Sequence, residues 1–162
     1  MANLVKSKII TTFQALEKAR NYCAYSERSQ YDVRVKLQEW SIDQVSLESI
    51  ISTLVEENFL NEERFAKAFA HGKLRINHWG RVKIKMALRQ HQVSDRCIKN
   101  ALNELDEDEY QQIIIKEAKK KIDLLTGSKA ILHKKTVTFL IGKGFESDLC
   151  CQIVINQINQ LK

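Results

Sequence analysis

The residues whose types and spacing could do chemistry lie between Glu63 and Asp95, a stretch that contains no acidic residue. Arg81, Lys85 and Arg89 recur every four residues, so on a helix they form one stripe of like charge, and such pairs repel by roughly 0.2–0.5 kcal/mol each. The missing acids indicate that an anionic partner, either phosphate or an acidic protein surface, supplies the neutralisation. The predicted contact residues in this stretch are Lys73, Arg75, Trp79, Arg81, Lys83, Lys85 and Arg89.

The distribution of charge favours the same place. The chain has 162 residues and a formal net charge of +6, from 26 basic and 20 acidic residues. Residues 61–105 hold ten basic and four acidic residues, which equals the whole net charge. Trp79 lies among these cations, where it could stack on a base or on a partner side chain. The alternative is a solvated basic face with Trp79 in the core, and both interpretations stay open.

Other chemistry is not indicated. No phosphate-binding Gly-x-x-x-x-Gly-Lys-Ser/Thr motif, no His-Glu-x-x-His motif and no paired Cys/His cluster occurs, so we expect no enzyme, no metal and no cofactor. The four cysteines lack metal-site spacing and are predicted to be buried thiols. Residues 1–8 lack the apolar run of a signal peptide, and no 18 consecutive residues are apolar, so we expect a soluble cytoplasmic protein without membrane contact.

The elements that must position the basic stretch are predicted to be helices, because the chain has no proline and only five glycines. Apolar spacing predicts helices over residues 8–25, 29–39 and 43–57. Ile9, Phe13, Leu16 and Cys23 are expected on the buried stripe of the first helix, and Ser41 with Gln44 has the spacing of a capping box before the third. Helix starts recur at residue 61 and after the acidic run at 106–109, so the pattern repeats twice.

The repeat has a period near 50 residues. Leu37, Leu88 and Leu140 correspond at offsets of 51 and 52, and the residue five positions further is apolar each time. Helical units at such a period stack into extended arrays. We therefore predict an all-α fold of three tandem three-helix units, residues 1–60, 61–105 and 106–162, forming an elongated, curved helical-repeat array.

Four motifs in this order resemble the RecX family of regulatory proteins, over essentially the full chain. They are Tyr25-Ser26-Glu27-Arg28-Ser29 followed by Val33, Arg34, Lys36 and Leu37; Phe59 through Ala66 continuing to Phe69; Gly80, Ile84 and Leu88; and Leu140 through Phe145. The chain departs from the family pattern at Asn61, where Asp is usual, and at Ser41 and Gln92, where the family commonly has glycine. Because a non-glycine residue resists positive φ, the two turns at Ser41 and Gln92 are expected to differ locally from the turn at Gly144.

The resemblance implies a protein without catalytic activity that binds the groove of the RecA–DNA filament. It implies limits on filament extension and on RecA ATPase, strand-exchange and co-protease activities, in homologous recombination, DNA repair and the SOS response. Arg28 and Arg34, from the first motif, join the predicted contacts. The outer units are expected to clamp adjacent RecA subunits, with DNA bound weakly or through the filament, by a monomer.

Two other function classes stay open. One is a direct nucleic-acid-binding module without a RecA partner, in which a third helix lies in a groove, although Arg96 and Lys99 offer few base-reading groups there. The other is a helical adaptor that binds only proteins and whose binding depends little on salt.

Overall fold

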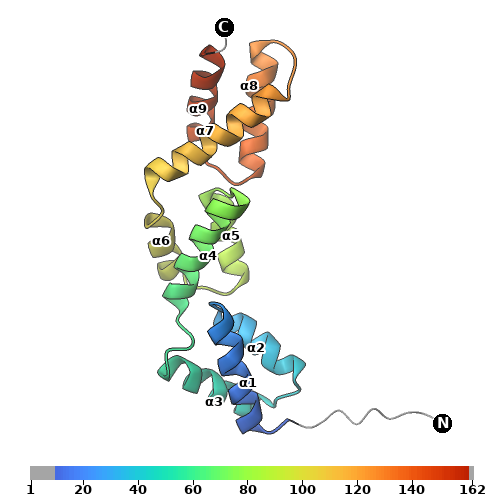
Figure 1. The fold of residues 1–162 in the computed structure, drawn as a ribbon, viewed down its shortest axis with the longest axis vertical. Coiled ribbons are helices and arrows are strands. Elements are labelled where there is room, and N and C mark those ends of the chain that lie inside the picture. The colour runs from blue at the N-terminus through green and yellow to red at the C-terminus, as the bar shows by residue number, and fades with distance from the viewer. Residues whose placement is uncertain (1–9, 161–162) are drawn as a thin grey trace, which may run out of the picture. The chain divides into compact units, whose positions relative to one another are not determined.

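The computed structural model describes residues 10–160, and this range contains nine α-helices and no strand (Figure 1). The all-α helical-repeat prediction is confirmed for the described range. The helices are α1 (Thr12–Tyr25), α2 (Gln30–Glu39), α3 (Gln44–Glu56), α4 (Glu62–Asn77), α5 (Arg81–Gln90), α6 (Asp95–Asn103), α7 (Glu107–Asp123), α8 (Lys129–Gly142) and α9 (Ser147–Asn159).

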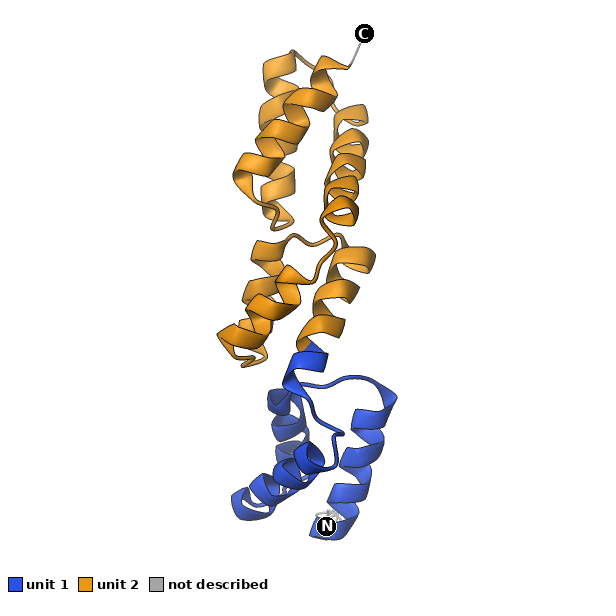
Figure 2. Ribbon diagram, turned by 90° about the vertical axis from the view of Figure 1, so that its left-hand side faces the viewer, with its two compact units in different colours: residues 1–65 blue, residues 66–162 orange. Residues whose placement is uncertain are grey.

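The chain divides into two compact units, residues 1–65 and 66–162 (Figure 2). Helix α4 begins in the first unit and continues into the second. The finer division into three units, with boundaries at residues 60 and 105, stays a prediction.

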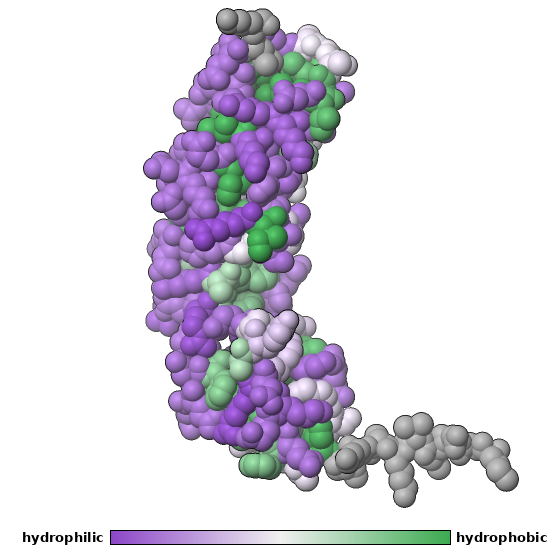
Figure 3. Space-filling model, in the orientation of Figure 1, coloured by the Kyte–Doolittle hydropathy of each residue, from purple (hydrophilic) through white to green (hydrophobic). Residues whose placement is uncertain are grey.

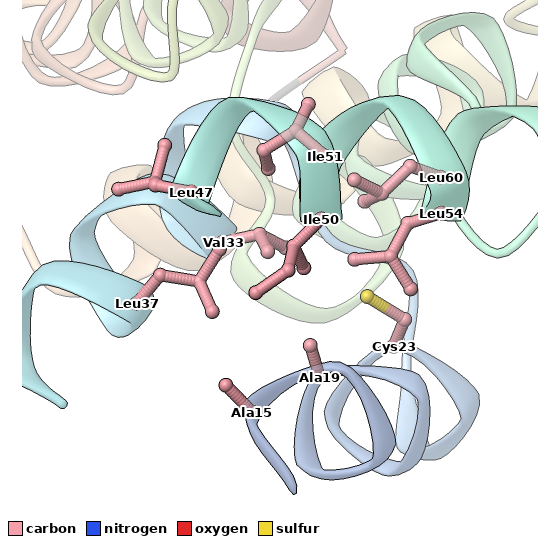
Figure 4. Close-up of a cluster of buried hydrophobic side chains, with 10 residues drawn as sticks. All are labelled: Ala15, Ala19, Cys23, Val33, Leu37, Leu47, Ile50, Ile51, Leu54 and Leu60. Carbon is pink, nitrogen blue, oxygen red and sulfur yellow. The ribbon is translucent and has the colours of Figure 1, made fainter. Parts of the chain in front are cut away.

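The core of unit 1 is built on small side chains of α1. Ala15, Ala19 and Cys23 recur every four residues, are buried, and face the apolar side chains of α2 and α3 (Figure 4). Small side chains let the helices approach closely, so the buried stripe follows these residues. The prediction for Phe13 is wrong, because its side chain is 70% exposed. Ile9 lies outside the described residues.

Helix α3 begins differently from the prediction. The side chain of Asp43, and not that of Ser41, caps the helix by accepting hydrogen bonds from the backbone N–H groups of Val45 and Ser46, at 3.1 and 3.0 Å. Carboxylates are favoured at this position because a helix N-terminus carries partial positive charge. The helix start predicted at residue 61 is confirmed: the side chain of Asn61 caps α4 by accepting a backbone N–H, and that of Ser94 caps α6 in the same way.

The turns that end α2, α5 and α8 are of one kind. Ser41, Gln92 and Gly144 have φ of 58°, 56° and 90°. The expectation that the first two turns differ is therefore wrong: the backbone hydrogen bonds of each turn offset the roughly 1–2 kcal/mol that a left-handed residue costs. In each turn the N–H of the next residue donates to a carbonyl five residues back: Ile42 to Leu37, Val93 to Leu88 and Phe145 to Leu140, at 3.1–3.2 Å.

Within unit 2, the start of α5 is joined to the turn between α8 and α9 by backbone hydrogen bonds. The N–H of Gly80 donates to the carbonyl of Lys143 at 2.9 Å, and that of Val82 donates to Gly144 at 3.0 Å. A Cβ on Gly80 would lie 2.2 Å from the carbonyl oxygen of Gly144, and a Cβ on Gly144 would lie 2.3 Å from Cβ of Lys83. We call this contact the backbone clasp, and it requires glycine on both sides.

A buried carboxylate lies beside the backbone clasp. Glu117 of α7 is 5% exposed, and its oxygens lie 2.9 Å from Nδ1 of His78 and 2.8 Å from Nζ of Lys143. Burial by itself would raise the pKa of Glu117, but the hydrogen bonds to Lys143 and His78 outweigh it and hold the pKa below its usual value. The clasp is thus supported by a charge pair as well as by backbone hydrogen bonds.

We predict that Gly144→Ala lowers the free energy of unfolding by about 3 kcal/mol, because the new methyl group meets Lys83 and the residue keeps a positive φ. Gly72→Ala is the matched control, since no atom lies within 4 Å of its added Cβ. That helical replacement should stabilise by about 0.5–1 kcal/mol. Urea unfolding checks both, and equal midpoints for the two variants would contradict the proposed role of the clasp.

Candidate polyanion-binding surface

The first residue of α5, Arg81, is held inside unit 2. Its backbone N–H donates to the hydroxyl of Tyr110 at 2.9 Å, and its guanidinium carbon lies 4.0 Å from the centroid of the Tyr110 ring. The guanidinium also pairs with Glu107 at 2.7 Å and with Glu146 at 3.5 Å. Its side chain is only 23% exposed, so Arg81 joins α5 to α7 and to the N-terminus of α9.

Tyr110 and Glu146 complete this cluster. The Tyr110 hydroxyl donates to Glu146 at 2.6 Å, and the tyrosine is fully buried. Burial, with the hydrogen bond to Glu146, raises the pKa of Tyr110 well above its usual range, so the hydroxyl keeps its proton. Each polar group of the cluster has a partner, as buried polar groups require.

Arg75, near the end of α4, also has an internal partner. Its Nε and one terminal nitrogen donate to the two oxygens of Glu109 at 2.8 and 2.9 Å. This paired geometry is the strong form of the interaction. The hydrogen bond to Arg75 lowers the pKa of Glu109, and the hydrogen bond to Arg81 lowers that of Glu107.

The acids at the start of α7 therefore neutralise part of the acid-free stretch. The sequence marks residues 106–109 only as an acidic run before a helix, and the ion pairs with Arg75 and Arg81 were not predicted from it. Asp106 does cap α7, by accepting the N–H of Glu109 at 2.7 Å. The available signal was a run of acids that follows the cation-rich residues 64–99, but which cations the acids reach depends on tertiary packing. Arg89 also pairs, with Asp95 at 3.0 Å, but both side chains are more than half exposed, and such pairs contribute little.

Three lysines of the predicted surface pair with no carboxylate in the described part of the chain: Lys73, Lys83 and Lys85. The ammonium groups of Lys73 and Lys83 lie 4.9 and 4.5 Å from the ring centroid of Trp79. Trp79 is half-buried, so it is not a core residue, and only part of its ring is accessible for stacking on a base or a partner side chain. We call Lys73, Trp79 and Lys83 the lysine–tryptophan cluster.

A hollow lies between α5 and α6. It has a volume of about 420 Å³ and is lined by Arg81, Lys85, Arg89 and Lys99, with one acid, Asp95. On the same helix, Val82 and Met86 are 49% and 61% exposed, whereas Ile84 and Leu88 are buried. Helix α5 therefore presents both cations and apolar side chains to solvent.

Arg28 and Arg34 lie in unit 1 and form no part of the clusters described in unit 2. Arg34 donates from Nε and a terminal nitrogen to the two oxygens of Glu48, at 3.2 and 3.1 Å, and so braces α2 against α3. The guanidinium of Arg28 lies 4.2 Å from the centroid of the Tyr22 ring. Its buried Nε has no hydrogen-bond partner among the described residues.

Over residues 10–160, no group of three or more His, Cys, Asp or Glu side chains is placed to hold a metal ion. In the same range, no helix combines the length and apolar character needed to cross a bilayer. Cys23, Cys97 and Cys150 are buried free thiols, and Cys151 is half-buried.

Comparison with known proteins gives a consistent set of relatives. Residues 61–102 match a family model described as "RecX, second three-helix domain". The chain is 30% identical over 136 residues to the regulatory protein RecX of Prosthecochloris aestuarii, with 84% of this chain and 88% of that protein covered. It is 32% identical over 130 residues to the regulatory protein RecX of Clostridium perfringens strain 13, with 78% of this chain covered. It spans 60% of the length of that relative.

The fold has a counterpart among solved structures. The crystal structure of RecX from Lactobacillus salivarius superposes with a TM-score of 0.83 at 21% identity, covering 93% of this chain and 97% of that one. At this level of identity the likeness concerns the fold alone, and it agrees with the all-helical architecture described above.

We predict that Arg81→Gln and Lys85→Gln, which each remove one positive charge, differ in their effect on stability. Arg81→Gln should cost about 1–3 kcal/mol, because it leaves the half-buried carboxylate of Glu146 without its cation. Lys85→Gln should change stability by less than about 0.5 kcal/mol, because its side chain is exposed and unpaired. Thermal unfolding monitored by circular dichroism measures both, and equal melting temperatures would show that the Arg81 cluster does not brace unit 2.

Proposed function

The chain belongs to the RecX family of regulatory proteins, and on this premise we propose that it binds the RecA–DNA filament and limits the filament's extension and activity. It acts in this proposal as a non-catalytic monomer in the cytoplasm, without a cofactor. Its outputs are lower RecA ATPase, strand-exchange and co-protease activities, in homologous recombination, DNA repair and the SOS response. The three-unit organisation, with outer units that clamp adjacent RecA subunits, belongs to the same proposal.

One observation carries the proposal: helix α5 exposes unpaired cations next to apolar side chains. Lys85 has no carboxylate partner among the described residues, and Val82 and Met86 on the same helix are about half exposed. Cations alone suit phosphates, whereas exposed apolar residues beside them suit a protein surface. A filament of protein on DNA offers both, so a composite partner fits this helix better than DNA alone.

The predicted site residues divide into two roles under this proposal. Arg34, Arg75 and Arg81 have internal carboxylate partners: Arg34 braces α2 against α3, and Arg75 and Arg81 position the helices of unit 2 that carry the surface. The residues proposed to contact the filament are Arg28, Lys73, Trp79, Lys83, Lys85 and Arg89. Within the lysine–tryptophan cluster, the indole holds two ammonium groups near each other, which concentrates positive charge at one point of the surface.

Direct binding to nucleic acid without RecA is the competing function, and the hollow lined by Lys85, Arg89 and Lys99 is the observation in its favour. Footprinting on naked duplex DNA separates the two functions. Sequence-specific protection without RecA would favour the competing function, whereas protection that requires RecA supports the proposal.

We predict that the protein lowers the ATPase activity of RecA on single-stranded DNA and that Lys85→Glu/Arg89→Glu raises the half-maximal inhibitory concentration at least about tenfold. The expected loss corresponds to about 1.4 kcal/mol of binding free energy, a modest value for two charge reversals at an interface. The readout is ATP hydrolysis over a range of inhibitor concentrations, with circular dichroism to show that the variant is still helical.

Lys119→Glu/Lys120→Glu is the matched control, because it reverses the same number of charges at two exposed positions of α7. It should inhibit as the unaltered protein does. Equal inhibition by the α5 variant and the unaltered protein would contradict the proposed surface. Loss of inhibition in the α7 variant as well would show that inhibition depends on the overall charge of the protein and not on the α5 surface.

A further inference from the structure

A second surface of unit 2 lies away from the acid-free stretch, where the end of α7 meets α8. It is an open hollow of about 700 Å³. Its apolar lining comes from three large side chains and its charged rim from three lysines. The apolar residues are Leu125, Ile131 and Phe139, and the lysines are Lys121, Lys134 and Lys135.

Large apolar side chains are exposed at this end of the unit. Ile131 is 45% exposed, and Leu124, in the loop beside it, is 75% exposed. Figure 3 shows hydrophobic side chains at the surface over the same end of α8. The loop is packed against Ile131, because a Cβ on Gly127 would lie 3.3 Å from Cγ2 of that residue. The apolar surface is therefore part of an ordered element.

The charge around the hollow is strongly positive. Residues 116–143 contain eight lysines and two acids, Glu117 and Asp123. Glu117 is already bound to Lys143 and His78, so Asp123 is the one acid left in this segment to oppose the lysines around the hollow. The net charge of residues 106–162 as a whole is small, because the acids at 106–109 offset the lysines in the sum. Two of these acids pair with Arg75 and Arg81, so they do not neutralise the lysines around the hollow.

The lining favours a protein segment over a nucleic acid. Leu125 and Ile131 are aliphatic and provide no ring on which a base could stack. The ring of Phe139 already has the ammonium groups of Lys121 and Lys143 at 5.1 and 5.4 Å from its centroid. Base stacking on aromatic rings is a main source of affinity for single strands, and no free ring lines this hollow. Carboxylates with a bulky apolar anchor match both the rim and the lining.

We infer that the hollow between α7 and α8 is a docking site for an acidic protein segment that carries a large apolar side chain. The anchor packs against Leu125 and Ile131, and the flanking carboxylates pair with Lys134 and Lys135. The inference does not depend on the proposed function, because the site lies on other helices from the α5 surface and binding can be measured without RecA.

The test uses fluorescence anisotropy with a short fluorescein-labelled peptide that has a Leu-Leu-Phe centre flanked by glutamates. Two further peptides carry a Ser-Ser-Ser centre or flanking lysines. The chain of residues 1–162 should bind the first peptide at least about tenfold more tightly than either of the others, because burying one large apolar side chain is sufficient for that ratio.

Variants locate the binding. Two variants, Ile131→Asp and Lys134→Glu/Lys135→Glu, should each weaken binding about tenfold. Residue 131 lies in the first turn of α8, where a carboxylate is compatible with the helix. Lys119→Glu/Lys120→Glu and Lys85→Glu/Arg89→Glu should leave it unchanged, and circular dichroism verifies the fold of every variant. Equal binding of the peptide with the Ser-Ser-Ser centre would overturn the inference. It would also be overturned if a thymidine oligonucleotide displaced the first peptide and if Lys134→Glu/Lys135→Glu abolished binding of that oligonucleotide.

Discussion

The organisation of unit 2 depends on the backbone clasp between Gly80 and the turn at Lys143 and Gly144. Two backbone hydrogen bonds and a contact too close for any Cβ fix the start of α5 against the turn that leads into α9. Arg81 follows Gly80 directly, so the clasp positions the guanidinium of Arg81 over the ring of Tyr110. In this position the guanidinium pairs with Glu107 of α7 and with Glu146 at the start of α9. A rearranged clasp would separate these groups and leave Glu146 without its cation.

The clasp explains why the acid-free stretch is not uniformly available to a partner. It brings the first turn of α7 to Arg75 and Arg81, and these two cations are neutralised within the protein. The next turn of α5 lies beyond the reach of those acids, so Lys85 stays unpaired and exposed among the described residues. The positive charge of the middle helices is thus divided into a bracing part and a part open to solvent, and only the second is suited to binding.

The helical class and most helix starts could be predicted from the sequence, because caps such as Asn61 and Ser94 and apolar spacing act locally. The exposure of Phe13 could not be predicted from the sequence. The small residues Ala15, Ala19 and Cys23 form another possible buried face of α1, and which face is buried depends on the packing of α2 and α3. The candidate surface could be located by its charge. Its ion pairs could not, because Arg75 and Glu109 are 34 residues apart and meet only through tertiary packing.

The division of charge is tested most directly by the salt dependence of binding to RecA-coated single-stranded DNA, measured for Lys85→Gln and Arg75→Gln. Each variant removes one cation, but only Lys85 is free to release counterions from a partner. The slope of log affinity against log salt should become shallower by roughly 0.7–1 for Lys85→Gln and stay unchanged for Arg75→Gln. An equal loss of slope in both variants would contradict the division of the middle helices into bracing and binding cations.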